Sequence, residues 1–554
     1  MNSLKPMLLS SLKNYDKSQF VKDVTAGIIV AIIALPLSIA LALASGVGPE
    51  AGIFTAIVAG FVISALGGSS VQIAGPTAAF ATIVAGIVAH DGMDGLIVAT
   101  ILAGIFLILM GLCHFGSLIK FIPFTITTGF TSGIAVTIVI GQLKDFFELT
   151  YPTGVKPIET VEKFEAVVNN FSTINMDAVI VGVVSLVILI IAPYIFKRIP
   201  GSLLAVIAGI VMIQLLPLKV NTIGNLYTIS NALPSLHFPS LSLNIIQNAL
   251  PNALTIAVLA AIESLLSCVV ADGMINGKHR SDMELVAQGA GNIASALFGG
   301  IPATGAIART AANIKNGGRT PIAGMVHSIT LVIVLVVLMP YAGMIPMPTI
   351  AAILFIVAYN MCQWRTLCQW RTFVNLVKTA PKSDIIVLVT SFGLTVIFDL
   401  VVAIEVGMVL ACLLFIKRMS EETKVNGWTY VDDDTPDVDE HLQKLPLQIR
   451  VYEISGPLFF GAASVIEEIA VKDFTTCLVL RMRSVPALDS TALNALKDLV
   501  QVCESKGITI VFSHVNDQPM KVMEKAGFIE LVGKENFQLN ISAALDRAEE
   551  IIHK

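Results

Sequence analysis

The chain has 554 residues, of which 55% are hydrophobic and only 14% are charged, and its mean hydropathy is +0.81. Soluble domains carry about 25% charged residues, so this composition excludes an ordinary soluble protein, a disordered chain and a disulfide-rich scaffold. The net charge of −5 says little about partners, because different regions of a membrane protein meet different surroundings. Apolar runs of roughly 20 residues recur through 24–417, and this length crosses about 30 Å of hydrocarbon. The sequence therefore predicts a polytopic α-helical membrane protein.

The hydropathy pattern divides the chain into four regions. Residues 1–23 are polar and basic, lack the apolar core of a cleavable signal peptide, and are predicted to be a cytoplasmic segment. Residues 24–418 are predicted to form the transmembrane domain. Residues 419–444 read as a linker that ends in an acidic, solvated run, and a soluble domain is expected over 445–554.

Fourteen spans are expected in the transmembrane domain. They cover 24–44, 50–66, 76–89, 95–113, 121–142, 177–196, 201–217, 250–270, 284–298, 302–315, 321–342, 348–361, 384–398 and 401–416. Placing the N-terminus inside puts most Lys and Arg residues of the loops on the cytoplasmic side, as the positive-inside rule requires. An even number of spans then places both termini in the cytoplasm, at the cell (inner) membrane.

Two of these segments, 76–89 and 302–315, are too short to cross the membrane alone. Each opens with proline and follows a glycine pair, Gly67-Gly68 in one case and Gly299-Gly300 in the other. Regions 24–217 and about 250–416 therefore look like two copies of a seven-span unit, and because seven is odd the second copy inserts upside down. Small residues can also serve helix packing. Two interrupted segments at matching positions are, however, typical of a secondary transporter.

The two half-spans predict an anion-binding site. A helix N-terminus offers unpaired N–H groups and roughly half a positive charge, and both favour an anion. Small residues at these ends let an oxyanion approach the backbone, and threonine hydroxyls can donate further hydrogen bonds. The expected substrate-binding residues are Thr77, Ala78, Ala79 and Phe80 in the first half-span and Thr304, Gly305 and Ala306 in the second.

Two charged residues lie inside the spans. Arg309, two turns into the tenth span, either pairs with a carboxylate, reaches the cytoplasmic surface or supplies positive charge to the anion site. Glu263, near the middle of the eighth span, is either the partner of Arg309, protonated or bound to a cation. It could carry a proton with the anion or, together with Ser267 one turn later, hold Na⁺.

Other kinds of chemistry find no support in the sequence. The seven cysteines are scattered without a CxxC motif or a His/Cys cluster, so we expect no metal site and no cofactor. No nucleophilic triad, GxSxG motif, Walker motif or paired-carboxylate spacing is present. We therefore expect neither an enzyme nor a primary pump, and no nucleic-acid partner.

Several motifs resemble the SulP family of anion transporters (solute carrier family 26), and the likeness covers nearly the whole chain. They are Ala34-Leu-Pro-Leu-Ser-Ile-Ala, Gly46-Val-Gly-Pro-Glu-Ala-Gly, Ala74-Gly-Pro-Thr-Ala-Ala-Phe, Gly129-Phe-Thr-Ser-Gly and Phe398-Asp-Leu-Val-Val-Ala-Ile-Glu-Val-Gly. The resemblance implies a seven-plus-seven inverted repeat with a core and a gate, elevator-like alternating access and a homodimer. It also implies substrates such as sulfate, bicarbonate, chloride or dicarboxylates.

Within the family, Ile262-Glu-Ser-Leu-Leu-Ser and Ala306-Ile-Ala-Arg309 are most similar to the bacterial C4-dicarboxylate members. Sodium-coupled bicarbonate members tend to have Asp at the position of Glu263 and Thr at that of Ser267. This departure favours a proton as the coupling ion. The expectation is a proton-coupled transporter of an oxyanion, with a sodium-coupled bicarbonate transporter, an uncoupled anion channel and a membrane-tethered regulator as alternatives.

The soluble domain alternates strands and helices, which predicts an α/β fold. The expected elements are strand 447–454, helix 461–471, strand 477–482, helix 490–506, strand 508–513 and helix 518–526. The run Val485-Pro-Ala-Leu-Asp489-Ser490-Thr491-Ala-Leu resembles a STAS domain, the fold of bacterial anti-sigma-factor antagonists. In those proteins the hydroxyl matching Thr491 is phosphorylated, so Ser490 and Thr491 are candidate regulatory residues facing a partner protein, although helix capping requires the same residue types.

Overall fold

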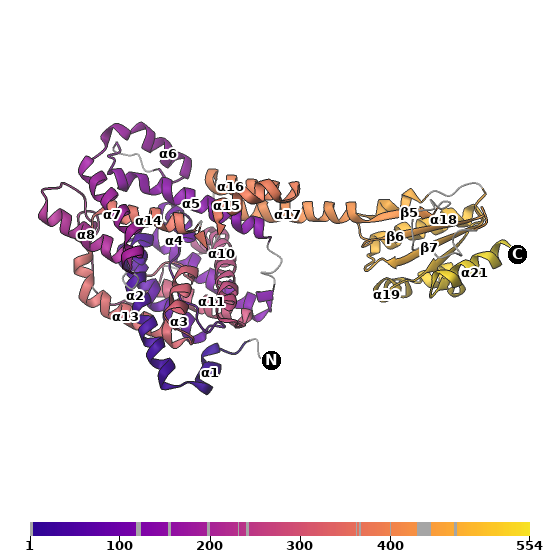
Figure 1. The fold of residues 1–554 in the computed structure, drawn as a ribbon, viewed down its shortest axis with the longest axis horizontal. Coiled ribbons are helices and arrows are strands. Elements are labelled where there is room, and N and C mark those ends of the chain that lie inside the picture. Colours follow the sequence, from indigo (N-terminus) through magenta and orange to yellow (C-terminus); the bar gives the residue numbers. More distant parts are fainter. Residues whose placement is uncertain are drawn as a thin grey trace. The chain divides into compact units, whose positions relative to one another are not determined.

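The computed structural model describes residues 4–117, 123–152, 157–196, 200–230, 232–239, 243–361, 363–364, 367–398, 400–428, 445–469 and 474–553. The chain forms two compact units, Met1–Met408 and Val409–Lys554 (Figure 1). The acidic run of the expected linker lies outside the described residues.

The spans of the first repeat lie in six helices. These are α2 (Lys17–Ala44), α3 (Pro49–Leu66), α4 (Ala78–Leu112), α5 (Phe124–Phe147), α7 (Met176–Ile195) and α8 (Gly201–Leu215). The third and fourth expected spans form the single element α4, which kinks at Gly92 with φ +71° and ψ −171°. Only glycine adopts this backbone conformation without strain, so the first half-span turns into the next span without a loop.

The spans of the second repeat lie in seven helices. These are α10 (Leu243–Ile275), α11 (Ser281–Leu297), α12 (Ile307–Lys315), α13 (Ile322–Ala342), α14 (Met347–Met361), α16 (Lys382–Ile397) and α17 (Leu400–Glu422). Among the described residues, seven helices are long and apolar enough to cross a membrane, and two shorter apolar helices accompany them. The polytopic helical architecture is thus confirmed, and the count of fourteen spans fits it.

Short elements join the spans, and the hydropathy pattern does not predict them. They are the helices α1 (Met7–Ser11), α6 (Thr160–Asn169), α9 (Ile223–Leu226) and α15 (Gln369–Thr379), and the strands β3 (Gln363–Trp364) and β4 (Leu367–Cys368). Helix α6 lies in the long loop expected outside the membrane and packs against α5 and α16.

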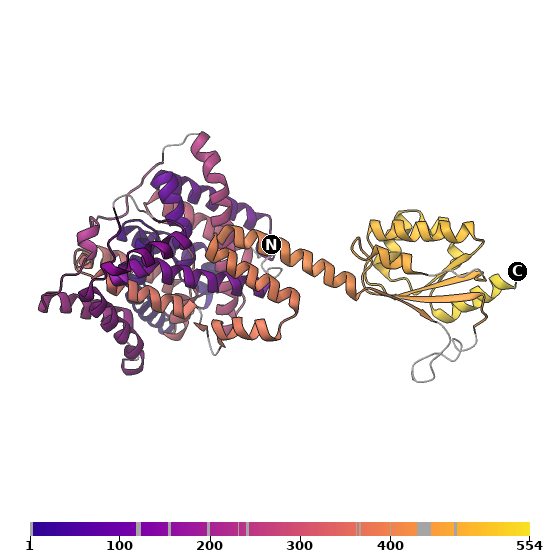
Figure 2. The same cartoon turned by 90° about the horizontal axis from the view of Figure 1, so that it is seen from above.

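The helix packing has the exchange symmetry of two repeats. Helix α4 packs on α10 and α11, and its counterpart α13 packs on α2 and α3. In the same way α5 packs on α16, its counterpart α14 packs on α7, and α5 and α14 pack on each other. Each of these contacts therefore has a partner contact that results when the two repeats are exchanged, as the repeat in the sequence predicts. Helices of the two repeats are interleaved in this unit, as the mixture of indigo to purple and pink to orange ribbons shows (Figure 2).

A two-stranded sheet lies where the half-spans begin. Strand β1 (Ala74–Gly75) pairs antiparallel with β2 (Thr304–Gly305), in the register Ala74 opposite Gly305 and Gly75 opposite Thr304. Each strand leads directly into a helix, β1 into α4 and β2 into α12. The sequence predicts the two interruptions but not that they pair.

The second unit contains a five-stranded sheet in the order β5-β6-β7-β8-β9. Strand β5 (Lys424–Trp428) runs antiparallel to β6 (Ile449–Ser455), whereas β6, β7 (Cys477–Ser484), β8 (Thr509–Ser513) and β9 (Phe537–Gln538) are parallel. This sheet confirms the α/β class. The helix expected over 461–471 is instead a 3₁₀ segment over Ala463–Glu468.

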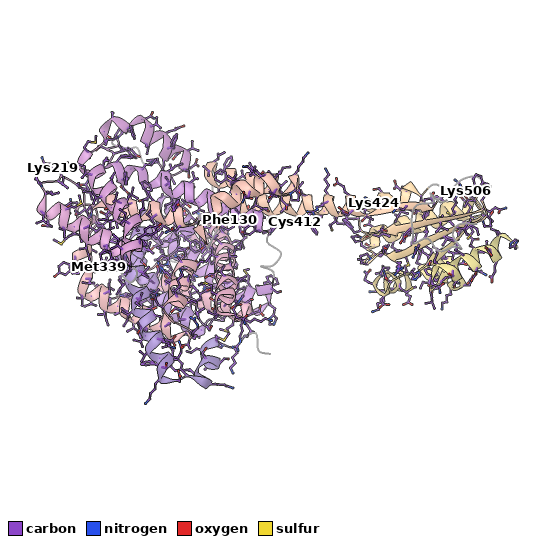
Figure 3. All side chains as sticks on the ribbon, in the orientation of Figure 1. Phe130, Lys219, Met339, Cys412, Lys424 and Lys506 are labelled. Carbon is purple, nitrogen blue, oxygen red and sulfur yellow. The ribbon has the colours of Figure 1, made fainter. Side chains whose placement is uncertain are left out.

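Helices cover both faces of this sheet. On one face Leu480 and Phe512 pack with Leu496 of α18 (Ser490–Ser505), and α19 (Asp517–Lys525) and α20 (Phe528–Val532) complete that layer. On the other face Val479 and Val511 pack against α21 (Ile541–Ile552). Because side chains alternate along a strand, apolar side chains point to both faces of the sheet. Lys424 at the start of β5 and Lys506 after α18 are exposed (Figure 3).

Candidate functional site

The paired strands bring the N-termini of α4 and α12 together. Thr77 is the N-cap residue of α4, and Thr304 in β2 precedes α12 by three residues. Their Oγ1 atoms are 3.4 Å apart. The half-spans that the sequence singles out, 227 residues apart along the chain, therefore meet at their N-terminal ends.

Glu263 of α10 joins the two half-spans. Its Oε2 atom accepts hydrogen bonds from Thr77 Oγ1 at 2.9 Å and from Thr304 Oγ1 at 3.0 Å. The carboxylate is partly exposed, as is Thr77. The two hydroxyls that we expected to donate to an anion thus donate to this carboxylate.

Arg309 is the third residue of α12 and so lies in its first turn, not two turns into a longer span. Its side chain is only 3% exposed, so it does not reach the cytoplasmic surface. Nη2 donates to Ser38 Oγ of α2 at 3.2 Å and to the carbonyl oxygen of Pro76 at 3.3 Å. Among the described residues, Nη1 has no hydrogen-bond partner and no carboxylate lies within 4.0 Å of the guanidinium.

Backbone N–H groups at the second half-span are partly engaged. Gly305 N donates to Ser264 Oγ at 3.1 Å, and Ala306 N donates to the carbonyl oxygen of Ile73 at 2.8 Å. An α-helix leaves its first N–H groups without an intrahelical partner. The donors that remain for a ligand are therefore those of the first turns, which begin at Ala78 in α4 and at Ile307 in α12.

The side chains around these first turns are small or apolar. Ala78, Ala79, Phe80 and Ala306 are buried, so they shape the site and pack behind it. Ala308, one residue before Arg309, is exposed. A ligand at this end of α12 meets a methyl group and not a bulky side chain.

Ser267 lies one turn after Glu263 on α10. It is 1% exposed, and its hydroxyl has no hydrogen-bond partner among the residues that the structure describes. A buried hydroxyl without a partner is costly unless a ligand or water satisfies it. Its oxygen is of the kind that a hard cation uses.

Buried polar side chains from neighbouring helices hold the loops that lead into the two strands. Thr310 Oγ1 accepts from Ile73 N at 3.0 Å, and Asn313 Nδ2 donates to the carbonyl oxygen of Val71 at 2.9 Å. At the other loop, Asn292 Oδ1 accepts from Ala303 N at 2.8 Å. Sequence reasoning assigned none of these roles, nor those of Ser38 and Ser264. The only feature of the sequence that could have pointed to these residues is their polar type within an apolar span.

The candidate regulatory residues lie at the start of α18. Asp489 is the N-cap: its Oδ1 accepts from Ala492 N at 2.9 Å and its Oδ2 from Phe460 N at 2.8 Å. Ser490 and Thr491 are both exposed. Because Asp489 caps the helix, capping does not account for these two hydroxyls.

Comparison with known proteins agrees with this architecture. Residues 20–391 match the sulfate permease family and residues 443–547 match the STAS domain. YvdB of Bacillus subtilis, which is named as a candidate sulfate transporter, is 38% identical over 536 residues, covering 95% of this chain and 97% of that protein. The bicarbonate transporter BicA of Picosynechococcus is 30% identical over 547 residues, covering 95% and 94%.

Solved structures show the same fold. The murine solute carrier 26 family member A9 anion transporter, in its inward-facing state, superposes with a TM-score of 0.87 at 19% identity and covers 99% of this chain and 94% of that one. The transmembrane domain of a cyanobacterial BicA gives a TM-score of 0.61 at 28% identity, with 72% and 98% coverage.

Proposed function

The chain belongs to the sulfate permease family, and from this premise we propose that it is a secondary transporter that moves an oxyanion together with a proton. The substrates that we propose are sulfate, bicarbonate or a C4-dicarboxylate. Relatives named for sulfate and for bicarbonate support the first two, and the motifs around Glu263 and Arg309 support the third. The observation that carries the proposal is that the Glu263 carboxylate accepts hydrogen bonds from both half-spans, at the N-terminal ends where we expect the anion to bind.

Charge counting links the anion to a proton. Arg309 contributes one positive charge, and the N-termini of α4 and α12 contribute roughly half a charge each. The site therefore carries about +1 when Glu263 is ionised and about +2 when it is protonated. An anion binds more favourably to the protonated form, and by thermodynamic linkage the bound anion favours protonation to the same extent.

The hydrogen bonds of Glu263 suit both protonation states. A threonine hydroxyl both donates and accepts. The ionised carboxylate accepts from Thr77 and Thr304, as in the structure. The protonated carboxyl group donates to one of them after that hydroxyl rotates. We propose that Glu263 takes up a proton with the anion on the outer side and releases it after the site opens inward.

We further propose that transport follows an elevator-like alternating access between a core and a gate, in a homodimer at the cell membrane with both termini in the cytoplasm. Residues 24–418 would transport, and the STAS domain over 445–554 would regulate. The exposed hydroxyls of Ser490 and Thr491 are its candidate phosphorylation sites. Phosphopeptide mapping of protein purified from its host tests this role, which fails if neither hydroxyl carries phosphate under any growth condition.

Sodium is the second candidate for the coupling ion. The unpartnered hydroxyl of Ser267 favours it, because this oxygen and the Glu263 carboxylate lie one turn apart on the same helix. A requirement for Na⁺ in the native protein would assign both residues to a cation site.

Reconstitution in liposomes tests the proposal. Native protein is expected to accumulate labelled sulfate, bicarbonate or succinate under an inward proton gradient, with saturable kinetics. Glu263→Gln keeps the size of the side chain but cannot titrate. It is expected to exchange labelled anion at equilibrium and to lose gradient-driven accumulation. Accumulation by the glutamine variant would refute the coupling role, and a current that does not saturate would favour an uncoupled channel.

A further inference from the structure

Glu284 of α11 is a buried carboxylate in the transmembrane unit, and transport as proposed above does not use it. The side chain is 1% exposed. Its Oε2 atom accepts from Gly68 N at 2.9 Å and from Ser69 N at 3.2 Å. Its Oε1 atom accepts from Gln72 Nε2 at 2.8 Å and from Gln288 Nε2 at 2.9 Å.

These four partners are all N–H donors, and two of them are backbone groups that cannot act as acceptors. With the two amides oriented as in the structure, a protonated carboxyl group would direct its own O–H at a donor. The arrangement therefore fits a carboxylate that stays ionised. Glu284 differs in this respect from Glu263, whose hydroxyl partners can reverse their hydrogen bonds.

Gln72 connects this carboxylate to the candidate anion site. Its Oε1 atom accepts from Cys268 Sγ of α10 at 2.8 Å, while its Nε2 atom donates to Glu284. The amide lies directly against Gly305 of β2, so that a Cβ atom added at Gly305 would overlap it. The hydrogen bonds of Gln72 thus hold its amide in the space that a side chain at position 305 would fill.

Gly305 needs this support because glycine has more conformational freedom than any other residue. It precedes the first turn of α12 by two residues, and its N–H donates to Ser264 Oγ. Movement of Gln72 would remove the side chain that packs on Gly305 and leave its backbone held by the pairing with Ala74 and the bond to Ser264, so that it could shift. The N-terminus of α12 would shift with this backbone. That shift would displace the N–H donors of the first turn of α12 and Arg309.

We infer that Glu284, acting through Gln72, is a positioning residue that holds the N-terminus of the second half-span in the geometry that binds the anion. This inference rests on the proposed anion site. It adds a carboxylate on α11 to the determinants of affinity, and it assigns Glu284 no part in proton transfer.

The test compares two glutamines that donate to the same carboxylate oxygen. Gln72→Met removes the hydrogen bond to Glu284 at the side chain that supports Gly305. Gln288→Met removes the bond that stays within α11, one turn from Glu284. Both variants leave Glu284 short of one donor, so both are expected to lower the thermal unfolding temperature of the purified full chain to a similar extent.

Anion affinity is expected to separate the two variants. In titrations of detergent-purified protein with sulfate, bicarbonate or succinate, Gln72→Met should raise Kd about tenfold or more, because small displacements of binding groups are costly. Gln288→Met should stay within about twofold of native. The pH dependence of gradient-driven uptake should keep its native shape in Gln72→Met, in contrast to Glu263→Gln.

The outcomes separate this inference from the function on which it rests. Failure of the native protein to bind any of these anions would reject the proposed function itself. Native affinity in Gln72→Met, or an equal loss of affinity in both glutamine variants, would reject the positioning role and leave Glu284 as a residue of general stability. A displaced pH profile in Gln72→Met would contradict the separation of Glu284 from proton transfer.

Discussion

Glu263 and Glu284 show how surroundings give one residue type two different roles. Both carboxylates lie in apolar helices, and among the described residues neither has an Arg or Lys within ion-pair distance. Threonine hydroxyls can donate to Glu263 or accept from it, so they suit this residue with or without a proton, whereas the N–H donors around Glu284 favour its ionised form. Position in a span makes a buried carboxylate a functional candidate, and its hydrogen-bond partners decide which function it can have.

Arg309 represents the opposite case, a buried cation without an anionic partner in the part of the chain that the structure describes. An unpaired charge in this position is expensive, and the protein retains it beside the N-terminus of α4, where Nη2 contacts the carbonyl oxygen of Pro76. Such a charge is favourable only when a ligand of opposite sign completes it. We therefore expect Arg309 to lower the stability of the empty state and to raise the affinity for an anion.

Replacing Arg309 with glutamine tests whether this residue lowers stability and raises anion affinity. Arg309→Gln is expected to raise the Kd for the transported anion at least about tenfold, since one charged hydrogen bond is worth about 1.5–3 kcal/mol. The thermal unfolding temperature is expected to stay equal or rise, because an unpaired buried charge is removed. Arg319→Gln is the control, since the Arg319 guanidinium donates to the carbonyl oxygens of Ile314, at the C-terminal end of α12, and of Gly318, away from the N-terminus of α12. Equal loss of affinity in both variants would contradict a specific role for Arg309.

Among the elements, the pair β1–β2 positions the site. Strands of two residues add little stability by themselves, but each leads into a helix whose N-terminus faces the other. Side chains from α11 and α12 hold the loop before β1, and side chains from α3 and α11 hold the loop before β2. The two repeats therefore fix each other, and neither half-span could be placed by its own repeat alone.

Gly75 of β1 lies directly against the side chain of Arg309 from the other half-span. A Cβ atom there would overlap Nη1 of Arg309. Gly75→Ala is therefore expected to displace the guanidinium and to raise the anion Kd about tenfold or more. Gly86→Ala within α4 is the matched control, because nothing lies within 4 Å of its added methyl group.

The control variant is expected to keep native affinity and to gain up to about 1 kcal/mol of helix stability. Isothermal titration and thermal unfolding of both variants check the pair. Native affinity in Gly75→Ala would show that the position of Arg309 does not limit binding.

Within the transmembrane unit, the N-terminal segment and the start of α2 are tied to loops of the second repeat. Arg280, between α10 and α11, donates to the carbonyl oxygen of Lys5 at 2.7 Å and to Ser10 Oγ at 2.8 Å. Asp23 at the start of α2 accepts from Tyr15 Oη at 3.1 Å and from Thr320 Oγ1 at 2.6 Å. The N-terminal segment and the second repeat are thereby linked through short polar contacts.

Tyr15 makes this link dependent on pH. Burial, the charge of Asp23 and the hydrogen bond to it raise the pKa of Tyr15 from 10.0 to about 12. The folded state therefore holds the phenol proton more tightly than the unfolded state. The stabilisation is complete below about pH 10 and is lost as the pH rises to about 12.

Tyr15→Phe removes the donor and should lower the unfolding temperature at about pH 9, with the difference from native protein vanishing near about pH 12. Unfolding curves across this range measure it. Tyr341→Phe, which removes an exposed phenol hydroxyl of α13, is the control variant. A difference between Tyr15→Phe and native protein that does not change with pH would remove the basis for a titrating link.

Local patterns in the sequence predict the class of the protein, its repeats and the main residues of its candidate site. Hydropathy is a property of a short window, so apolar helices stand out without any knowledge of their neighbours. Glu263 and Arg309 stand out for the same reason, because a charge inside an apolar run is rare. Family motifs cover most of the chain and identify the STAS domain as well.

The contacts at the site could come only from the folded chain. The bond between Gln72 and Glu284 joins residues 212 positions apart, and the bond between Thr77 and Glu263 joins residues 186 positions apart. No local window contains both members of such a pair. The packing of the helices of one repeat against those of the other decides which polar groups meet once water is excluded. That packing determines whether a carboxylate lies near Arg309 and whether a threonine hydroxyl already has a partner within the chain.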